Sequence, residues 1–291
     1  MSDSRRLVLV DGHAVLYRAF FAIKGLSTSG GQATNAVFGF VRMLRQLRET
    51  WAPTHWAVFF DGGLPESRLA ILEEYKAQRP RMPDELRSQI PLVEEYLDCA
   101  GIAWIRRDGE EADDVIASVA RRLAGHGDEV LLATGDKDMF QLVGETVRIV
   151  PVSGRENKAM GPAEVEEKTG VPPEQIVEWL AMVGDSSDNI PGVPGVGPKT
   201  AARLLRDFGS IDAIMERIDE IKREKLRACL LEHRDRMAAN VEMVRLRDDL
   251  ECELDWEDTE VRGADEERLL VFFERLELKS FAQELREKTL F

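Results

Sequence analysis

The sequence predicts an α/β protein with a mainly parallel sheet, joined to a second part that is mostly helical. Over the first 150 residues, short apolar runs typical of buried strands alternate with longer stretches of helical periodicity. After Pro151 the pattern is helical almost throughout, apart from a Gly- and Pro-rich stretch at 190–205. We therefore expect a sheet part at residues 1–170 and a helical part at residues 171–291.

The elements of the sheet part follow from the spacing of its apolar residues. Continuous aliphatic and aromatic runs predict strands, and apolar residues at helical spacing predict helices. The expected strands are 7–10, 56–60 and 130–133, and the expected helices are 36–47 and 115–123. Strands that alternate with helices pair in parallel, so their carboxyl ends are expected at one edge of the sheet.

A polar stretch of mixed charge, Glu66–Pro83, follows the second strand. It contains Tyr75, Lys76, Arg79 and Arg81. One interpretation is a solvated surface helix and loop, which is the usual role of such a run. The other is a mobile, partly basic element over a cleft.

The helical part has three recognisable segments. Pro172 and Pro173 stand where a helix over 174–183 would start. The helical pattern resumes over 210–246 after the Gly- and Pro-rich stretch. A last helix is expected from about Asp265 onward.

Composition excludes several classes of protein. The chain has 291 residues, 44% hydrophobic and 32% charged, which excludes general disorder. No apolar run approaches the ~20 residues of a membrane span, and the start lacks the apolar stretch of a signal peptide. Cys99, Cys229 and Cys252 are too few and too far apart for a disulfide framework or a Cys-rich zinc site. We expect a cytoplasmic monomer with no membrane partner.

The net charge of −15 does not exclude nucleic acid as a partner. Residues 251–291 hold 13 acidic and 6 basic side chains, so nearly half of the excess lies in this segment. Nine further carboxylates belong to the motifs described below. The rest of the chain is close to neutral, which leaves room for a local basic track along a phosphate backbone.

Acidic side chains follow three of the expected strands. Asp11 ends the first, Asp61 the second, and Asp136 and Asp138 follow the third. Ligands of open α/β sheets bind outside the carboxyl ends of the strands, so these four side chains are expected at one crevice. For any one of them alone, a turn former or a helix N-cap is the commoner role.

Two more segments add five acidic residues. Glu111, Asp113 and Asp114 fall in the first turn of a helix, where capping is one interpretation, although three acids exceed what a cap requires. Asp185 and Asp188 follow the end of a helix, where the helix dipole disfavours anions unless a cation offsets it.

Nine carboxylates gathered at one place indicate a metal site, because unpaired like charges repel one another. Ligation by carboxylates alone selects hard cations, and it suits Mg²⁺ or Mn²⁺ better than Zn²⁺. Hydrolysis of a phosphodiester with two metal ions is the chemistry that such a site favours.

The Gly- and Pro-rich stretch predicts a phosphate-binding hairpin at the start of a helix. Its residues of interest are Gly192, Gly195, Gly197, Lys199 and Thr200. Amides at a helix N-terminus bind phosphate without reading a base. An ordinary connection between helices is the alternative, and the spacing of a nucleotide-binding P-loop is absent. The pattern resembles a helix-hairpin-helix that contacts a duplex backbone.

Six motifs in one order resemble the bacterial and phage 5'-nuclease family. That family includes the 5'-to-3' exonuclease domain of DNA polymerase I and the flap endonucleases. The motifs are VDG at Asp11, FDG at Asp61, YKAQR at Tyr75–Arg79, EADD at Glu111–Asp114, TGDKD at 134–138 and GDSSDNIPGVPGVGPKTA at 184–201. The resemblance extends from Leu7 to about Phe208, and more loosely to the end of the chain.

The resemblance implies a fold and a set of roles. The fold is a PIN-like or resolvase-like sheet with a helical arch at about 64–91 and a helix-hairpin-helix (helix-three-turn-helix) lobe with its hairpin at about 184–208. The implied metal ligands are Asp11, Asp61, Glu111 and Asp113 for one ion, and Asp136, Asp138, Asp185 and Asp188 for the other, with Asp114 in support. The implied contacts to DNA are Arg18, Tyr75, Lys76, Arg79 and the hairpin; Arg18 and Lys76 match basic residues that contact the scissile phosphate.

The implied function is a structure-specific 5'-nuclease, acting as flap endonuclease and 5'-to-3' exonuclease in replication and repair. It would use Mg²⁺ or Mn²⁺, with K⁺ at the hairpin, and act on 5' flaps, nicks, 5' ends and RNA–DNA primers in functional connection with a DNA polymerase. A non-catalytic binder of branched DNA and a PIN-type ribonuclease are the alternatives. A phosphatase with an aspartate nucleophile ranks last, because it leaves the hairpin unexplained.

Overall fold

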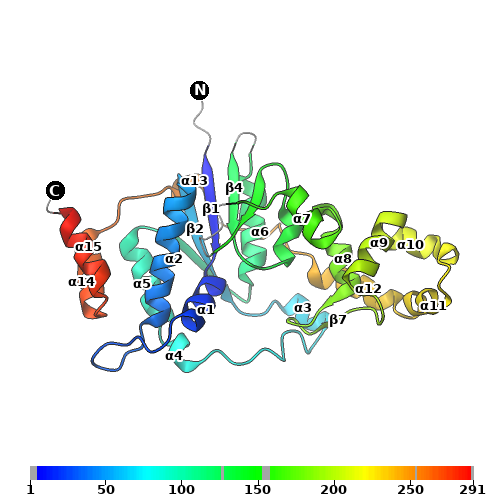
Figure 1. Cartoon of the computed structure of the whole chain (residues 1–291), viewed down its shortest axis with the longest axis horizontal. Helices are drawn as coiled ribbons and strands as arrows, with labels where there is room; N and C mark the ends of the chain where they lie inside the picture. The colour runs from blue at the N-terminus through cyan, green and yellow to red at the C-terminus, as the bar shows by residue number, and fades with distance from the viewer. Residues whose placement is uncertain (1–4, 126–127, 153–157, 253, 290–291) are drawn as a thin grey trace.

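The computed structural model describes residues 5–125, 128–152, 158–252 and 254–289. Residues 1–4 of the expected start and Glu253 of the acidic segment lie outside this part. The centre of the molecule is a five-stranded sheet in the order β3-β2-β1-β4-β5, with every neighbouring pair parallel (Figure 1). The strands are β1 (Arg6–Asp11), β2 (His55–Gly62), β3 (Ala103–Asp108), β4 (Glu129–Ala133) and β5 (Val147–Val150).

Helices surround this sheet and make up the rest of the chain. Those before residue 130 are α1 (Gly12–Ala22), α2 (Asn35–Trp51), α3 (Glu66–Ile71), α4 (Asp84–Arg87), α5 (Ile90–Ala100) and α6 (Ala112–Leu123). Those that follow are η1 (Asp138–Leu142), α7 (Pro162–Thr169), η2 (Pro173–Gln175), α8 (Ile176–Val183), α9 (Pro198–Phe208), α10 (Ile211–Glu216), η3 (Ile218–Glu220), α11 (Glu224–Glu232), α12 (Arg234–Val244), α13 (Trp256–Thr259), α14 (Glu266–Arg275) and α15 (Lys279–Thr289).

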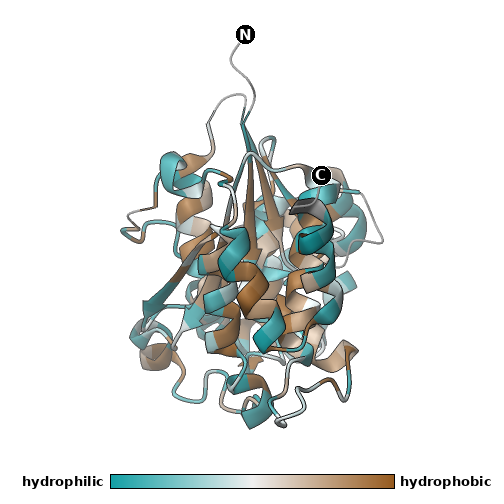
Figure 2. Cartoon of the chain, turned by 90° about the vertical axis from the view of Figure 1, so that its left-hand side faces the viewer, coloured by the Kyte–Doolittle hydropathy of each residue, from teal (hydrophilic) through white to brown (hydrophobic). Residues whose placement is uncertain are grey.

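The central strands are buried on both faces, which explains their unbroken apolar runs. Along β1, Leu7 and Leu9 face one core, and Val8 and Val10 face the other. Helices α1, α2 and α5 cover the second face, and α6 covers the first. Figure 2 shows the apolar strands enclosed between helices of mixed hydropathy.

The three expected strands are present, and two more lie at the edges of the sheet. β3 reads AWIRRD and β5 reads VRIV, so neither has the continuous apolar run that predicts a buried strand. An edge strand has one unpaired side and is less completely buried, and its sequence is correspondingly more polar.

The helical part continues the core that begins under the sheet. Apolar residues of α8, α9 and α12 belong to the same buried cluster as α6 and the strand residues Leu7 and Leu9. Helices α9, α10 and α11 extend away from the sheet to one end of the molecule (Figure 1). None of the described helices is both long and apolar enough to cross a membrane.

The last segment returns to the sheet part. Asp265 caps α14 by accepting from the amide of Arg268, but the expected single helix is two, because the chain reverses at Glu277 (φ 55°). Phe273 and Phe281 pack with Tyr96 of α5 in the core on the far face of the sheet. The division at residue 170 stays a prediction, and α14 packs against α5, so that α14 and α15 lie on the outer side of the sheet part (Figure 1).

The polar stretch Glu66–Pro83 is only partly solvated. It forms the short helix α3 and a series of turns. Arg68 and Tyr75 are buried, with 6% and 3% of their surface exposed. The interpretation as a solvated surface run is therefore wrong for these two side chains, which point into the protein.

Candidate functional site

The carboxyl ends of β1, β2 and β4 meet at one edge of the sheet, as the parallel pairing requires. Asp11 is the last residue of β1, Asp61 lies near the end of β2, and Asp136 follows β4. A cavity of about 400 Å³ opens at this edge, lined by Asp11, Asp136 and Asp185 among others. The strand-end acids therefore share one polar depression.

Local hydrogen bonds hold the first two of these side chains. Asp11 Oδ1 accepts from the amide of Ala14 and so caps α1, while its Oδ2 accepts from Thr134 Oγ1 at 3.2 Å. Asp61 Oδ1 accepts from the amide of Ala112, the first residue of α6. The capping interpretation is thus correct for Asp11, whereas Asp61 accepts from the first amide of a helix 51 residues away, whose N-cap residue is Glu111; both contacts fix a carboxylate at the edge of the sheet.

Burial and the repulsion of neighbouring carboxylates raise the pKa values of Asp11, Asp113 and Asp136, which lie together near Asp61. Burial, with the charges of Asp61 and Asp136, raises the pKa of Asp11 to about 7. Burial and the charges of Asp11 and Asp136 also raise the pKa of Asp113 well above its usual value. These carboxylates carry more negative charge than the fold itself compensates.

A second group consists of Asp138, Asp185 and Asp188, which offer oxygens within 4.8 Å of one another. Asp138 starts η1, and the other two lie in the segment that follows α8. Burial and the charge of Asp136 raise the pKa of Asp138 well above its usual value. For Asp185, burial is outweighed by the Ser187 hydroxyl and by Lys137, and its pKa is lowered.

The donor set fits divalent cations. Among the described residues, Asp138 Oδ1 is one of few buried side-chain atoms that lack a hydrogen-bond partner. Such an atom is costly unless something absent from the polypeptide satisfies it. Because both groups offer only carboxylate oxygens, hard cations such as Mg²⁺ are the ions that these residues suit.

Glu111 and Asp114 contact cationic side chains. Glu111 accepts from Arg68, from Lys76 and from the hydroxyl of Tyr75. Asp114 is fully buried, and its two oxygens accept from the two terminal nitrogens of Arg68. The structure therefore brings both acids to the site, with their charges already compensated by the protein.

Arg68 and His13 also belong to the site, although no sequence pattern indicates them. Arg68 stands in a charged run with no local pattern to mark it, and its partners lie at least 43 residues away. His13 Nδ1 accepts from the amide of Asp61, and burial lowers the pKa of the ring. The neutral ring thus helps to hold the end of β2.

The basic residues of the YKAQR motif lie against the carboxylates. Lys76 Nζ contacts Glu111 and lies 3.5 Å from Asp188 Oδ2, while Arg79 Nη2 lies 2.5 Å from Asp188 Oδ1. The backbone of Lys76 is left-handed (φ 54°), and its amide donates to the carbonyl of Asp188. Arg18, by contrast, lies on the exposed side of α1.

The hairpin begins where the second carboxylate group ends. Strands β6 (Gly184–Asp185) and β7 (Ile190–Pro191) pair in antiparallel fashion. They approach so closely at Gly192 that a Cβ there would lie 2.1 Å from the carbonyl oxygen of Val183. Gly192 is thus needed for packing, which ties the turn bearing Asp188 to the hairpin.

The tip of the hairpin combines buried anchors with an open backbone. Val193 and Val196 are buried, whereas Gly195, Gly197 and Lys199 are exposed. Space around Gly195 and Gly197 is open, and Gly197 is the N-cap residue of α9. Pro198 has no amide hydrogen, and the amides of Thr200 and Ala201 donate to the carbonyl of Gly197, so the amides of the exposed residues Gly197 and Lys199 are those that an anion can reach. Thr200 lies half-buried beside them.

Two family models match adjoining parts of the chain. Residues 6–170 match the N-terminal resolvase-like domain of the 5'-3' exonucleases, and residues 171–267 match their C-terminal SAM fold. The chain belongs to the 5'-3' exonuclease family. The resemblance read from the motifs and the predicted fold class are confirmed, and the family is one of nuclease enzymes.

The relatives of this 5'-3' exonuclease chain differ in length. The 5'-3' exonuclease of Aquifex aeolicus is 38% identical over 97% of this chain and 95% of its own. DNA polymerase I of Bacillus caldotenax is 40% identical over 97% of this chain, but over only 32% of its own. This chain thus spans about a third of the length of the polymerases that it matches.

Solved structures share the fold. The T5 D15 protein co-crystallised with metal ions superimposes with a TM-score of 0.66 and 26% identity, over 84% of this chain and 90% of its own. The catalytic core of Rad2 in complex with DNA substrate has a TM-score of 0.61 and 16% identity, over 94% and 87% of the two chains. Together with the carboxylate groups, the metal-bound relative indicates that divalent metal is used here.

Proposed function

We propose that the chain is a structure-specific 5'-nuclease that cuts DNA near junctions of single and double strands and leaves 5'-phosphate and 3'-hydroxyl ends. One observation carries this proposal. Asp185 is the last residue of β6, Asp188 lies in the turn between β6 and β7, and the hairpin begins directly after β7. A duplex strand held by the hairpin backbone is therefore delivered beside the carboxylates.

The carboxylates are proposed to hold two divalent ions, Mg²⁺ or Mn²⁺. When bound, the ions would stabilise the charge that develops on the attacking and leaving oxygens of a phosphodiester. The proposed ligands are Asp11, Asp61, Glu111 and Asp113 for one ion and Asp136, Asp138, Asp185 and Asp188 for the other. Asp114, enclosed by Arg68, supports this set without an open oxygen of its own.

The basic side chains of the site are proposed to bind and orient the phosphate. Lys76 and Arg79 already lie at the carboxylate edge, where they offset part of the negative charge that would repel DNA. Tyr75 packs beside Lys76, with the ammonium 5.0 Å from the ring centroid. Arg18, exposed on α1, is free to reach a phosphate from the opposite side of the edge.

The hairpin is proposed to grip one duplex strand without reading its sequence. The amides of Gly197 and Lys199 and the side chains of Lys199 and Thr200 suit a phosphate at the N-terminus of α9. Gly195 leaves the backbone accessible. A K⁺ ion at the hairpin would complement the phosphate in the same contact.

The proposed substrates are 5' flaps, nicks, 5' ends and RNA–DNA primers. A 5'-nuclease that acts on them removes what a polymerase displaces, and several relatives of this chain are named DNA polymerase I. We infer a functional connection with a DNA polymerase in replication or repair on this basis.

Cleavage of a labelled substrate tests the proposal. A 5'-flap duplex and an RNA hairpin are incubated with the protein in Mg²⁺, Mn²⁺ or chelator, beside the variants Asp185→Asn and Asp219→Asn. Asp219 is exposed on η3, far along the chain from the carboxylate groups, and serves as the matched control.

The expected result is metal-dependent cutting of the flap near its junction by the wild type and by Asp219→Asn. Substitutions just outside a metal's ligands typically lower activity roughly 10- to 100-fold. Asp185→Asn is expected to lower the cleavage rate by more than this, because Asp185 is a proposed ligand. Tight flap binding without any product would leave a binder of branched DNA. Cutting confined to the RNA would favour a PIN-type ribonuclease instead.

A further inference from the structure

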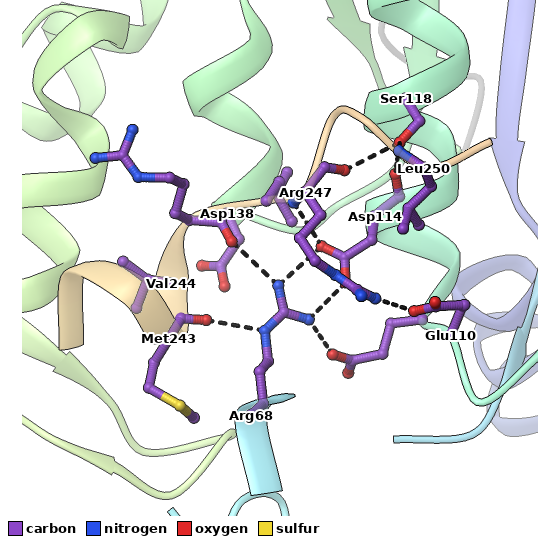
Figure 3. A network of polar contacts seen from close by, with 12 residues as sticks. Arg68, Glu110, Asp114, Ser118, Asp138, Met243, Val244, Arg247 and Leu250 are labelled. Carbon is purple, nitrogen blue, oxygen red and sulfur yellow. Dashed lines mark hydrogen bonds and ion pairs between the residues drawn. The ribbon is translucent and has the colours of Figure 1, made fainter. Parts of the chain in front are cut away.

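Arg68 uses every donor of its guanidinium to join three parts of the chain. Nη1 and Nη2 donate to the two oxygens of Asp114, and Nη1 also donates to Glu111, both at the start of α6. Nε donates to the carbonyl of Met243 at 3.0 Å, and Nη2 to that of Arg245 at 3.2 Å. Figure 3 shows the guanidinium between α6 and the end of α12.

The carbonyls that Arg68 binds belong to the end of α12 and the segment that follows it. The last carbonyls of a helix have no partner within the helix, so an arginine is a favourable one. The same segment donates the amide of Arg247 to Asp114 and the amide of Leu250 to Ser118 on α6 (Figure 3). It therefore lies along the helix that carries the metal-site acids.

The same segment also contacts the second carboxylate group. Gln141 of η1 donates to the carbonyls of Asp138 and Val244, and it accepts from the amide of Leu246. Both acid-bearing elements, α6 and η1, are thus attached to the end of α12 by hydrogen bonds.

One turn earlier, α12 is attached to the hairpin. Asn240 is buried, and its amide nitrogen donates to the carbonyls of Ala181 and Pro191, at 2.9 Å each. Ala181 belongs to α8, and Pro191 is the last residue of β7 before the hairpin. Asn240 and Met243 lie three residues apart, on one face of α12.

We propose that Arg68 is a positioning residue and that Asn240, α12 and Arg68 connect the hairpin to the metal-site acids. Because the connection consists of hydrogen bonds through one rigid helix, the hairpin, the base of the segment 66–79 and the start of α6 form one mechanical unit. The distance between a DNA strand held by the hairpin and the acids around Glu111 is then fixed. This role rests on the proposed function.

Mn²⁺ binding and steady-state kinetics on a 5'-flap duplex test the connection. The variants are Arg68→Lys, which keeps the charge and loses the planar fork of donors, and Asn240→Leu, which keeps the volume and loses both donors. Arg148→Lys is the control, because Arg148 is exposed on β5 at the edge of the sheet. Mn²⁺ is titrated by electron paramagnetic resonance without DNA, so this readout does not depend on turnover.

Arg68→Lys is expected to weaken Mn²⁺ binding by about 10- to 100-fold and to lower kcat, with KM within about twofold of the wild type. Asn240→Leu is expected to bind Mn²⁺ like the wild type and still to lose kcat by about tenfold or more, because only the attachment to the hairpin is broken. Arg148→Lys should match the wild type in both measurements.

Wild-type Mn²⁺ affinity and kcat in Arg68→Lys would overturn the proposal, as would a wild-type kcat in Asn240→Leu. If circular dichroism shows that Arg68→Lys does not fold, the kcat of Asn240→Leu alone tests the proposal, and a wild-type kcat would overturn it. Failure of the proposed function looks different, because the unmodified protein would then not cut the flap at all.

Discussion

The two terminal nitrogens of Arg68 lie 2.8 Å from the two oxygens of Asp114, in a pair that is buried on both sides. Burial opposes the charge of Asp114, while Arg68 supports it. Asp113, the preceding residue, lies among other acids, and the charge of Lys76 offsets only part of their repulsion. Burial raises the pKa of both aspartates, but removing the charge of Asp114 breaks a buried ion pair, whereas removing the charge of Asp113 relieves a repulsion.

The first prediction is that Asp114→Asn destabilises the protein and Asp113→Asn does not. Removing one partner of a buried ion pair costs about 3–5 kcal/mol of unfolding free energy. Asp113→Asn removes a repulsion and is expected to leave the urea midpoint in chelator equal or higher. Equal losses in the two variants would contradict the assignment of Asp114 to the interior and Asp113 to the metal group.

The second prediction concerns pH. The pKa of Asp11 is about 7 in the fold against 3.8 unfolded, so the folded state holds a proton that the unfolded chain releases. The stability this provides is complete below about pH 3.8 and is lost as the pH rises through about 7. The raised pKa values of Asp113 and Asp138 act in the same direction. The lowered pKa of Asp185 affects the stability of the fold only in strong acid.

Without metal, the melting temperature is therefore expected to fall between about pH 5.5 and about pH 8. Mg²⁺ should raise it more at the higher pH, because the cation binds carboxylates that have lost their protons. Thermal unfolding in chelator and in Mg²⁺ across this range measures both effects. A larger effect of Mg²⁺ at the acid end would be inconsistent with carboxylate ligation.

The third prediction isolates the hairpin backbone. Gly197 has an ordinary backbone conformation and open space around it, so Gly197→Ala should fold normally. The added methyl group stands where a phosphate would approach the start of α9, and the affinity for duplex DNA is expected to fall at least about fivefold. Gly263→Ala is the control, since Gly263 is likewise open and exposed. Binding titrations that rank the two variants equally would argue against a phosphate contact there.

The fourth prediction concerns the packing of the last two helices. Phe273 is fully buried in the core that α14 and α15 share with α5. Phe273→Ala should cost about 3–5 kcal/mol of unfolding free energy, whereas Leu231→Ala, at an exposed position, should cost less than about 0.5 kcal/mol. Cleavage per folded molecule should be unchanged in both. A small loss in Phe273→Ala would mean that α14 and α15 are loosely attached.

The strand-end acids and the hairpin could be predicted because their positions follow from short stretches of sequence. An apolar run of five residues is a buried strand almost regardless of its surroundings, and its parallel neighbours bring the following acids to one edge. Local capping also holds within a few residues, as Asp11 with Ala14 and Asp265 with Arg268 demonstrate. The edge strands β3 and β5 could not be predicted in this way, because their apolar runs are short and interrupted by charged residues.

The sequence by itself determined the fold class, the order of the central strands' acids and the family to which the chain belongs. Only the tertiary structure decided that Arg68 is buried, that Asn240 reaches the base of the hairpin and that α14 and α15 return to the sheet. The physical reason is distance along the chain: Arg68 and Arg245 lie 177 residues apart. No local periodicity records such a contact, and a buried charge becomes favourable only once its distant partners have gathered around it.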